Sequence, residues 1–328
     1  MSFLPVPEKR IATPRELVFL LLPIAGILIA LGLHLATPDV YPEDYEPTTY
    51  SNTLLVCLAI YIIFAAFSCF FPKLRAKVLH LTGLLFALFL ALELLDILTL
   101  KTGILRLPFI PSPDKTLSTF TTRTAELAES FVASMQLLLT GLVIGAATGF
   151  ISGLLIGWSQ ICAYWFSPVM KIIGPIPSAA WLPIAVAIMP SSRAAGLFLI
   201  ALAMWFPLTL MFSSAIRDTD KRLVETARVL GASETYIMFN VALPASLPAI
   251  FTGLFMGMSN SFSALIVAEM LGVKSGLGWY IIWAQGWGEY GRVFSTVGVF
   301  IVIFFVLITL LFKLRDHVMK WQKGLVRW

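Results

Sequence analysis

Acidic side chains inside apolar segments are the first candidates for chemistry in this sequence. Glu93 and Asp96 are three residues apart in an apolar run, so they share one face of the helix expected there. Glu269 closes the outer end of another apolar run. A carboxyl group within a membrane span is costly, and it commonly serves the passage of ions, protons or substrate. These three acids are therefore candidates for a substrate or proton role.

Other chemically active groups form no catalytic or metal-binding pattern. The three histidines, His34, His80 and His317, lie near the ends of different apolar runs, and the three cysteines lack metal-ligand spacing. The sequence holds no nucleophile–base pair and no G-x-x-x-x-G-K-[ST] phosphate loop. We therefore expect no catalytic residue, no metal and no cofactor bound by this chain.

The composition indicates an integral membrane protein. The 328 residues are 59% hydrophobic and 12% charged, and their mean hydropathy is +0.89. Soluble domains carry about a quarter charged residues, and apolar runs of about 20 residues match a helix that crosses a bilayer. We expect an all-α membrane protein with about eight transmembrane helices. The expected spans cover residues 17–36, 53–71, 79–100, 131–158, 168–189, 194–216, 245–270 and 293–312.

Basic residues predict the orientation of these spans, because Lys and Arg favour the cytoplasmic side. They gather in the first 16 residues, in the turn 73–77 and in the tail 313–327, whereas the acidic loop 37–52 has none. Both termini and the polar loop 217–244 are therefore expected in the cytoplasm. Because the net charge of +5 comes from loops and ends, it indicates a lipid surface rather than nucleic acid as the partner.

Prolines and serines indicate the wall of a solute pathway. Pro175, Pro177 and Pro183 forbid a regular helix in the fifth span, and broken membrane helices are tolerated where they line a cavity. Ser259 and Ser263 share a helix face and would either line a wet path or bond back to their own helix. The predicted pathway residues are Pro177, Ser178, Trp181, Ser259, Ser263 and Glu269.

A glycine stripe marks the fourth span as a packing surface. Glycine recurs every four residues from Gly141 to Gly157. This spacing places small residues on one helix face and lets a second helix approach closely.

The polar loop 217–244 has its own helical pattern. A helix is expected from Glu225, a left-handed bend at Gly231, and a second helix capped by Ser233. Leu243 and Pro244 are expected to end that helix where the next span begins.

Within this loop the chain resembles a known family. Its residues match the EAA loop of binding-protein-dependent ABC importer permeases, which reads E-A-A, three residues, G, nine residues, I, one residue, L-P. Thr226 stands for the second residue and Val241 for the Ile. The fifth span and the GLGW sequence after Glu269 look like the nitrate, sulfonate, taurine and bicarbonate branch. The similarity covers about residues 105–320.

The resemblance implies a type I importer core of six helices over residues 79–328, preceded by a two-helix extension over residues 1–78. It also implies a second, identical permease subunit, two ATP-binding subunits that hold ATP and Mg²⁺, an extracytoplasmic substrate-binding protein and a bacterial inner membrane. The residues that it assigns to ATPase coupling are Glu225, Thr226, Ala227, Gly231, Ala232, Ser233, Leu243 and Pro244.

The branch favours a small anion such as nitrate, sulfonate or bicarbonate as the substrate. The spans from 131 to 216 offer only Lys171 and Arg193, both near membrane edges, so serines and helix N-termini would hold an anion. A neutral vitamin or heterocycle precursor is the alternative within the family. Three alternative functions lie outside the family. They are a secondary transporter driven by Glu93, Asp96 or Glu269, a membrane scaffold, and a membrane enzyme, which would need a catalytic cluster.

Overall fold

Helices account for the architecture. The computed structural model describes residues 14–40, 48–105 and 108–320, and no strand occurs among them. In these described ranges, seven helices are long and apolar enough to cross a membrane, or eight if one bent helix pair counts as a span. The all-α class and the expected number of spans are confirmed. Lys9, Arg10 and residues 41–47 of the acidic loop lie outside the described residues.

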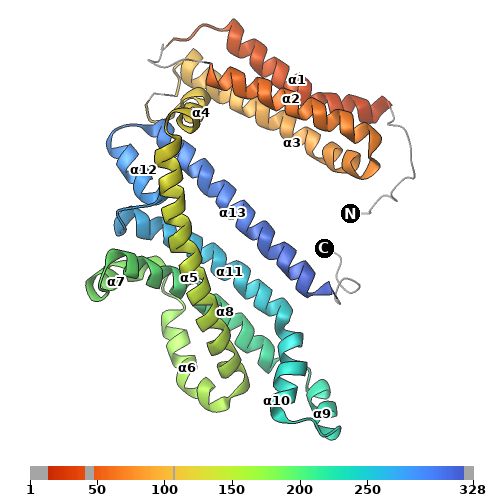
Figure 1. Cartoon of the computed structure of the whole chain (residues 1–328), viewed down its shortest axis with the longest axis vertical. Helices are drawn as coiled ribbons and strands as arrows, with labels where there is room; N and C mark the ends of the chain where they lie inside the picture. The colour runs from red at the N-terminus through yellow and green to blue at the C-terminus, as the bar shows by residue number, and fades with distance from the viewer. Residues whose placement is uncertain (1–13, 41–47, 106–107, 321–328) are drawn as a thin grey trace. The chain divides into compact units, whose positions relative to one another are not determined.

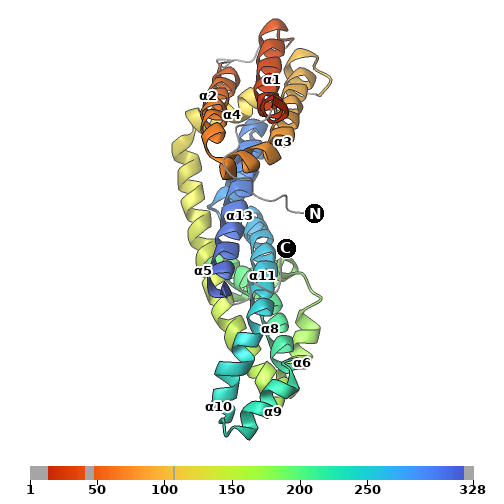
Figure 2. The same ribbon diagram turned by 90° about the vertical axis from the view of Figure 1, so that its right-hand side faces the viewer.

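The chain divides into two compact units. The first holds three long helices that lie side by side (Figures 1 and 2), followed by a short π-helical turn and a ten-residue helix, together with Ala284–Ser295. Its helices are α1 (Pro14–Ala36), α2 (Thr49–Phe70), α3 (Pro72–Asp96), the π turn Ile97–Lys101 and α4 (Pro113–Thr122). Because α3 packs on α1 and α2, the extra N-terminal helices share their core with the third span. The division at residue 78 stays a prediction.

The second unit contains the bent helix pair and the polar loop. Its helices are α5 (Thr124–Trp158), α6 (Gln160–Ile173), the 3₁₀ turn Ser178–Trp181, α7 (Leu182–Ile188), α8 (Ser192–Arg217), α9 (Lys221–Val229), α10 (Glu234–Ile237) and α11 (Leu243–Leu271), followed by α12 (Leu277–Gly286) and α13 (Tyr290–Val318). Two of the boundaries between the units fall within α12 and α13, because Ala284–Ser295 belongs to the first unit. The longest packed interface in this unit joins α8 and α11, around Leu208, Phe212 and Ile250.

The glycine stripe of α5 packs against α8, as predicted. A Cβ atom on Gly145 would lie 2.5 Å from the carbonyl oxygen of Ala201 and 2.6 Å from Cβ of Met204. The other four stripe glycines meet Ile200, Leu208, Phe212 and Ile216, which follow one another along α8. Glycine is required here because any larger residue would push the two helices apart.

The fifth span is broken where the prolines predict. Gln160–Ile173 and Ser178–Ile188 meet at an angle of 90°. Pro175 and Pro177 lie in the break and donate no backbone N–H, so the helix stops rather than curves. Pro183 sits in the first turn of α7, where its missing N–H costs nothing.

Replacing Gly145 by valine should destabilise the second unit by about 1–3 kcal/mol, because the new side chain would overlap the backbone of α8. Thermal unfolding of the purified protein in detergent measures the change. Gly298→Val in α13 is the matched control, since a Cβ there meets nothing within 4 Å. Equal effects of the two substitutions would contradict the packing role of the stripe.

Candidate transport pathway and coupling loop

A cavity of about 240 Å³ lies in the second unit between the broken span, α8 and α11. Pro177, Ser178 and Ser263 line it, together with Asn260. The predicted pathway residues Ser259, Trp181 and Glu269 are not among its lining residues. Three of the six predicted residues thus meet at one cavity, and Asn260 was not among those predicted.

The cavity wall is apolar with a few neutral polar groups. No ionisable side chain is among its lining residues in the described part of the chain. Pro207 of α8 and Ala203, one turn earlier, both line it, and Pro207 has no N–H to donate to the Ala203 carbonyl. Hydroxyl, amide and carbonyl groups in an apolar wall suit a small solute that is oriented by hydrogen bonds.

Ser259 and Ser263 form hydrogen bonds within their own helix, which was one of the two alternatives expected from the sequence. The Ser259 hydroxyl donates to the Phe255 carbonyl at 2.9 Å, and Ser263 donates to the Ser259 carbonyl at 3.4 Å. Buried Ser261 instead donates to the Ile200 carbonyl at 2.9 Å and joins α11 to α8. Of these serines, Ser263 also faces the cavity.

Glu269 fastens the segment after α11 to α5. Its Oε2 accepts from the Ser134 hydroxyl at 2.9 Å and from the Gly278 N–H at 2.8 Å, and the Ser134 oxygen accepts from the Leu277 N–H at 2.7 Å. Gly276, at φ +98°, and Gly278 leave room for the Glu269 side chain, because a Cβ on Gly276 would overlap its carboxylate and a Cβ on Gly278 would overlap its Cβ. Glu269 is 1% exposed, so its surroundings are those of a structural anchor.

The polar loop has the predicted bend and cap. Gly231 adopts φ +83° between α9 and α10, a conformation that favours glycine. The Ser233 hydroxyl accepts from the Tyr236 N–H at 3.2 Å and begins α10. In both views α9 and α10 lie together where they join α8 and α11 (Figures 1 and 2).

An ion pair across the bend was not anticipated from the sequence. Arg228 Nε donates to Glu234 Oε1 at 2.8 Å, and this carboxylate raises the pKa of the guanidinium, with a smaller contribution from Glu225. The predicted residue Glu225 lies exposed on α9. The sequence signal that could have predicted this ion pair is the pair of opposite charges, Arg228 and Glu234, placed three residues before and after Gly231.

The expected helix stop at Leu243 and Pro244 is wrong. A single helical path runs from Glu234 to Leu271. The π-helical segment Met238–Ala242 precedes Pro244, and the Leu243 N–H donates to the Met238 carbonyl. Pro244 donates no N–H, but the wider π-helical turn directly before it accommodates the proline, so the helix continues.

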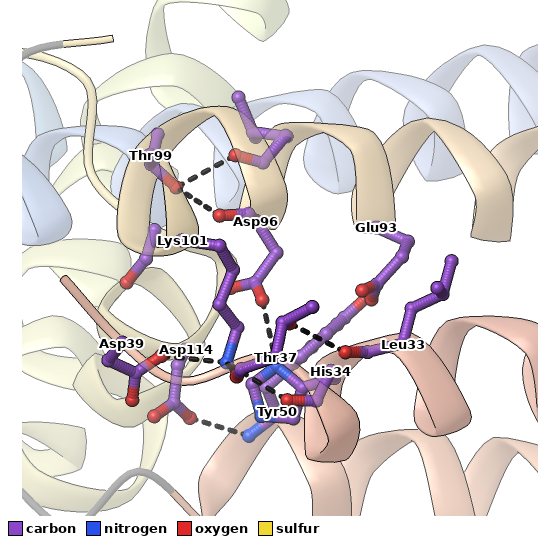
Figure 3. Close-up of polar contacts among 12 residues, drawn as sticks. Leu33, His34, Thr37, Asp39, Tyr50, Glu93, Asp96, Thr99, Lys101 and Asp114 are labelled. Carbon is purple, nitrogen blue, oxygen red and sulfur yellow. Dashed lines mark hydrogen bonds and ion pairs between the residues drawn. The ribbon is translucent and has the colours of Figure 1, made fainter. Parts of the chain in front are cut away.

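The two acids of the third span, Glu93 and Asp96, belong to the first unit, whereas the cavity residues belong to the second. Glu93 and Asp96 are buried, and Asp96 pairs with His34 at the end of α1 (Figure 3). The sequence placed the two acids on one helix face, but it gave no sign that a histidine meets them.

The family follows from the segment that contains the cavity and the loop. Residues 137–322 match the model of the binding-protein-dependent transport system inner membrane component. The chain belongs to this family. It is thus a multi-pass permease of the ABC importer class.

Relatives of this chain carry transport names. The putative aliphatic sulfonates transport permease SsuC of Bacillus subtilis is 27% identical over 224 residues, which are 68% of this chain and 81% of that protein. The nitrate import permease NrtB of Leptolyngbya laminosa is 30% identical over 179 residues, 55% of this chain and 62% of that protein. These names agree with the nitrate and sulfonate branch that the sequence resembles.

A solved structure shows the same fold. A chain of the MetNI methionine ABC transporter, crystallised in inward-facing conformations, superposes with a TM-score of 0.52 at 16% identity. The match covers 60% of this permease and 99% of that chain. The likeness therefore spans nearly the whole of that chain and shows the fold of the matched part of this one.

Glu269→Ala should lower the stability of the permease by about 1–3 kcal/mol, because the buried Ser134 hydroxyl and Gly278 N–H lose their acceptor. Thermal unfolding in detergent measures the loss. Glu129→Ala removes an exposed carboxylate from α5 and should change the unfolding temperature little. An unchanged unfolding temperature for Glu269→Ala would contradict the anchor role.

Proposed function

We propose that this permease forms the solute pathway of an ATP-driven, binding-protein-dependent importer and that the loop 217–244 couples it to a separate ATPase. The observation that supports this coupling role is the bend of the loop, which exposes apolar side chains at its tip. Val229 is 88% exposed and Leu230 is 80% exposed, next to the Gly231 bend. Such exposure outside the apolar spans is typical of a protein contact surface.

The loop is well placed to move the cavity wall. It begins at the end of α8, and its second helix, α10, continues without a break into α11. These two helices pack on each other along their length, and both line the cavity. A partner that moved the loop would therefore act on two of the cavity walls.

The proposed assembly follows the family. It contains two copies of this permease, two ATP-binding subunits that hold ATP and Mg²⁺, and a substrate-binding protein on the extracytoplasmic side. The loop and both termini face the cytoplasm of a bacterial cell. ATP hydrolysis belongs to the partner subunit in this proposal.

Leu230→Asp should reduce co-purification of the permease with its ATPase and lower transport-linked ATP hydrolysis by about tenfold, because it places a charge on an apolar contact. Gly231→Pro should act similarly, since it removes the N–H that donates to the Arg228 carbonyl. ATPase recovered per permease, and its activity in proteoliposomes, are the measurements.

Ile104→Asp is the matched control, because Ile104 is 68% exposed in the loop between the third and fourth spans. It should leave ATPase recovery unchanged. If Leu230→Asp and Gly231→Pro both retain normal ATPase recovery and transport, the coupling role of the loop is refuted.

For the substrate we propose a small anion such as nitrate, a sulfonate or bicarbonate. The relatives' names support it, and so does a basic hollow of about 630 Å³ in the first unit. Lys115, Arg123 and Arg292 line that hollow beside several Ser and Thr hydroxyls, with Glu289 as its one acidic residue among those described. Excess positive charge in a hollow raises the local anion concentration.

A neutral heterocycle precursor is the second candidate for the substrate. The observation in its favour is the cavity of the second unit, whose described lining residues include no charged side chain. The two candidates differ in their dependence on the basic hollow.

The double variant Lys115→Gln/Arg123→Gln should slow uptake of an anionic substrate about 3- to 10-fold at low ionic strength, with a smaller effect at high salt. Initial uptake by the reconstituted importer measures this. Lys313→Gln/Lys320→Gln removes the same charge from the C-terminal end of the described chain and is the control. Unchanged uptake by Lys115→Gln/Arg123→Gln would favour the neutral substrate, and equal slowing by both pairs would contradict the role of the basic hollow.

A further inference from the structure

A buried polar cluster lies in the first unit, outside the segment that matches the family. It consists of His34 from α1 with Glu93 and Asp96 from α3 (Figure 3). One ligand atom from each residue lies within 4.8 Å of the others. Their exposed fractions are 6%, 1% and 0%. The proposed import function gives this cluster no task.

Packing of the three N-terminal helices holds these side chains together. His34 Nδ1 and Asp96 Oδ2 are 2.8 Å apart. The Tyr50 ring of α2 stands edge-on to the His34 ring, with 5.1 Å between centroids, and its hydroxyl donates to Glu93 Oε2 at 3.4 Å. The three residues and their aromatic neighbour therefore come from all three long helices of this unit.

The cluster carries acceptor oxygens that the surrounding protein does not satisfy. Glu93 Oε1 and Asp96 Oδ1 are buried and accept no hydrogen bond from the described residues. Lys101, the nearest amine, directs its three donors to the His34 and Thr37 carbonyls and to Asp39. Two buried carboxylates beside a single imidazole are costly unless a cation compensates them.

We propose that His34, Glu93 and Asp96 bind a divalent transition metal ion, with Zn²⁺ and Mn²⁺ fitting best. One imidazole nitrogen and two carboxylate oxygens form a ligand set that suits these ions. Ligands at about 2.1 Å from an ion lie about 3–3.5 Å from one another. The side chains therefore need to move by about 1 Å to close around it, and the unsatisfied oxygens of Glu93 and Asp96 then gain a partner.

The ion would cross-link α1 and α3. His34 lies in the last turn of α1, and Asp96 is the last residue of α3. Tyr50 would hold Glu93 in position as an outer partner of the site. The proposed site is independent of the loop, the cavity and the ATPase, so it stands or falls apart from the import function.

Metal content of the full-length permease tests the site. The protein is purified in detergent with a tag that contains no histidine, stripped with a chelator, incubated with Zn²⁺ or Mn²⁺ and freed of unbound ion. Elemental analysis should find about one ion per chain. The triple variant His34→Gln/Glu93→Gln/Asp96→Asn should bind at least about tenfold more weakly. His80→Gln, an exposed histidine of α3, should retain the ion.

Thermal unfolding gives a second measurement that does not require the variants to fold. The wild type and His80→Gln should unfold at a higher temperature with the ion than without it, and a chelator should reverse the shift. Equal metal content in the wild type and the triple variant would overturn the proposal, as would a wild type whose unfolding temperature ignores Zn²⁺ and Mn²⁺. The cluster would then be a hydrogen-bonded network that shares protons.

Discussion

Backbone hydrogen bonding in a medium without water is the constraint on which this permease depends. In lipid, each N–H and C=O group must find its partner within the protein, so the spans are helices. The break in the fifth span departs from that rule. It is tolerated because the broken segment packs against α8 and lines a cavity. The cavity therefore lies where regular helix is interrupted.

Helix α8 is the element that the other parts of the second unit share. The glycines of α5 press against one of its faces, Ser261 of α11 bonds to its Ile200 carbonyl, and its proline-containing turn lines the cavity. Its own end leads into the polar loop. A helix held on several sides transmits displacement as a rigid body, because packed interfaces do not deform continuously.

Features encoded by neighbouring residues could be predicted from the sequence. The spans, the glycine stripe, the Gly231 bend and the Ser233 cap all depend on spacings within a few turns of helix. Contacts between distant residues could not be predicted this way. Ser134 meets Glu269 across 135 residues, and His34 meets Asp96 across 62, so no local pattern reports either pair. The predicted helix stop at Pro244 was wrong because a π-helical turn directly before the proline accommodates it within a continuous helix.

The continuous helix from Glu234 to Leu271 makes the two ends of the loop mechanically unequal. On the α8 side, residues 218–220 and the Gly231 bend interrupt the helical path. On the α11 side there is no such interruption, only a widened turn. In the proposed coupling, a displacement of α10 would reach α11 through continuous helix, whereas it would reach α8 only across the two interruptions.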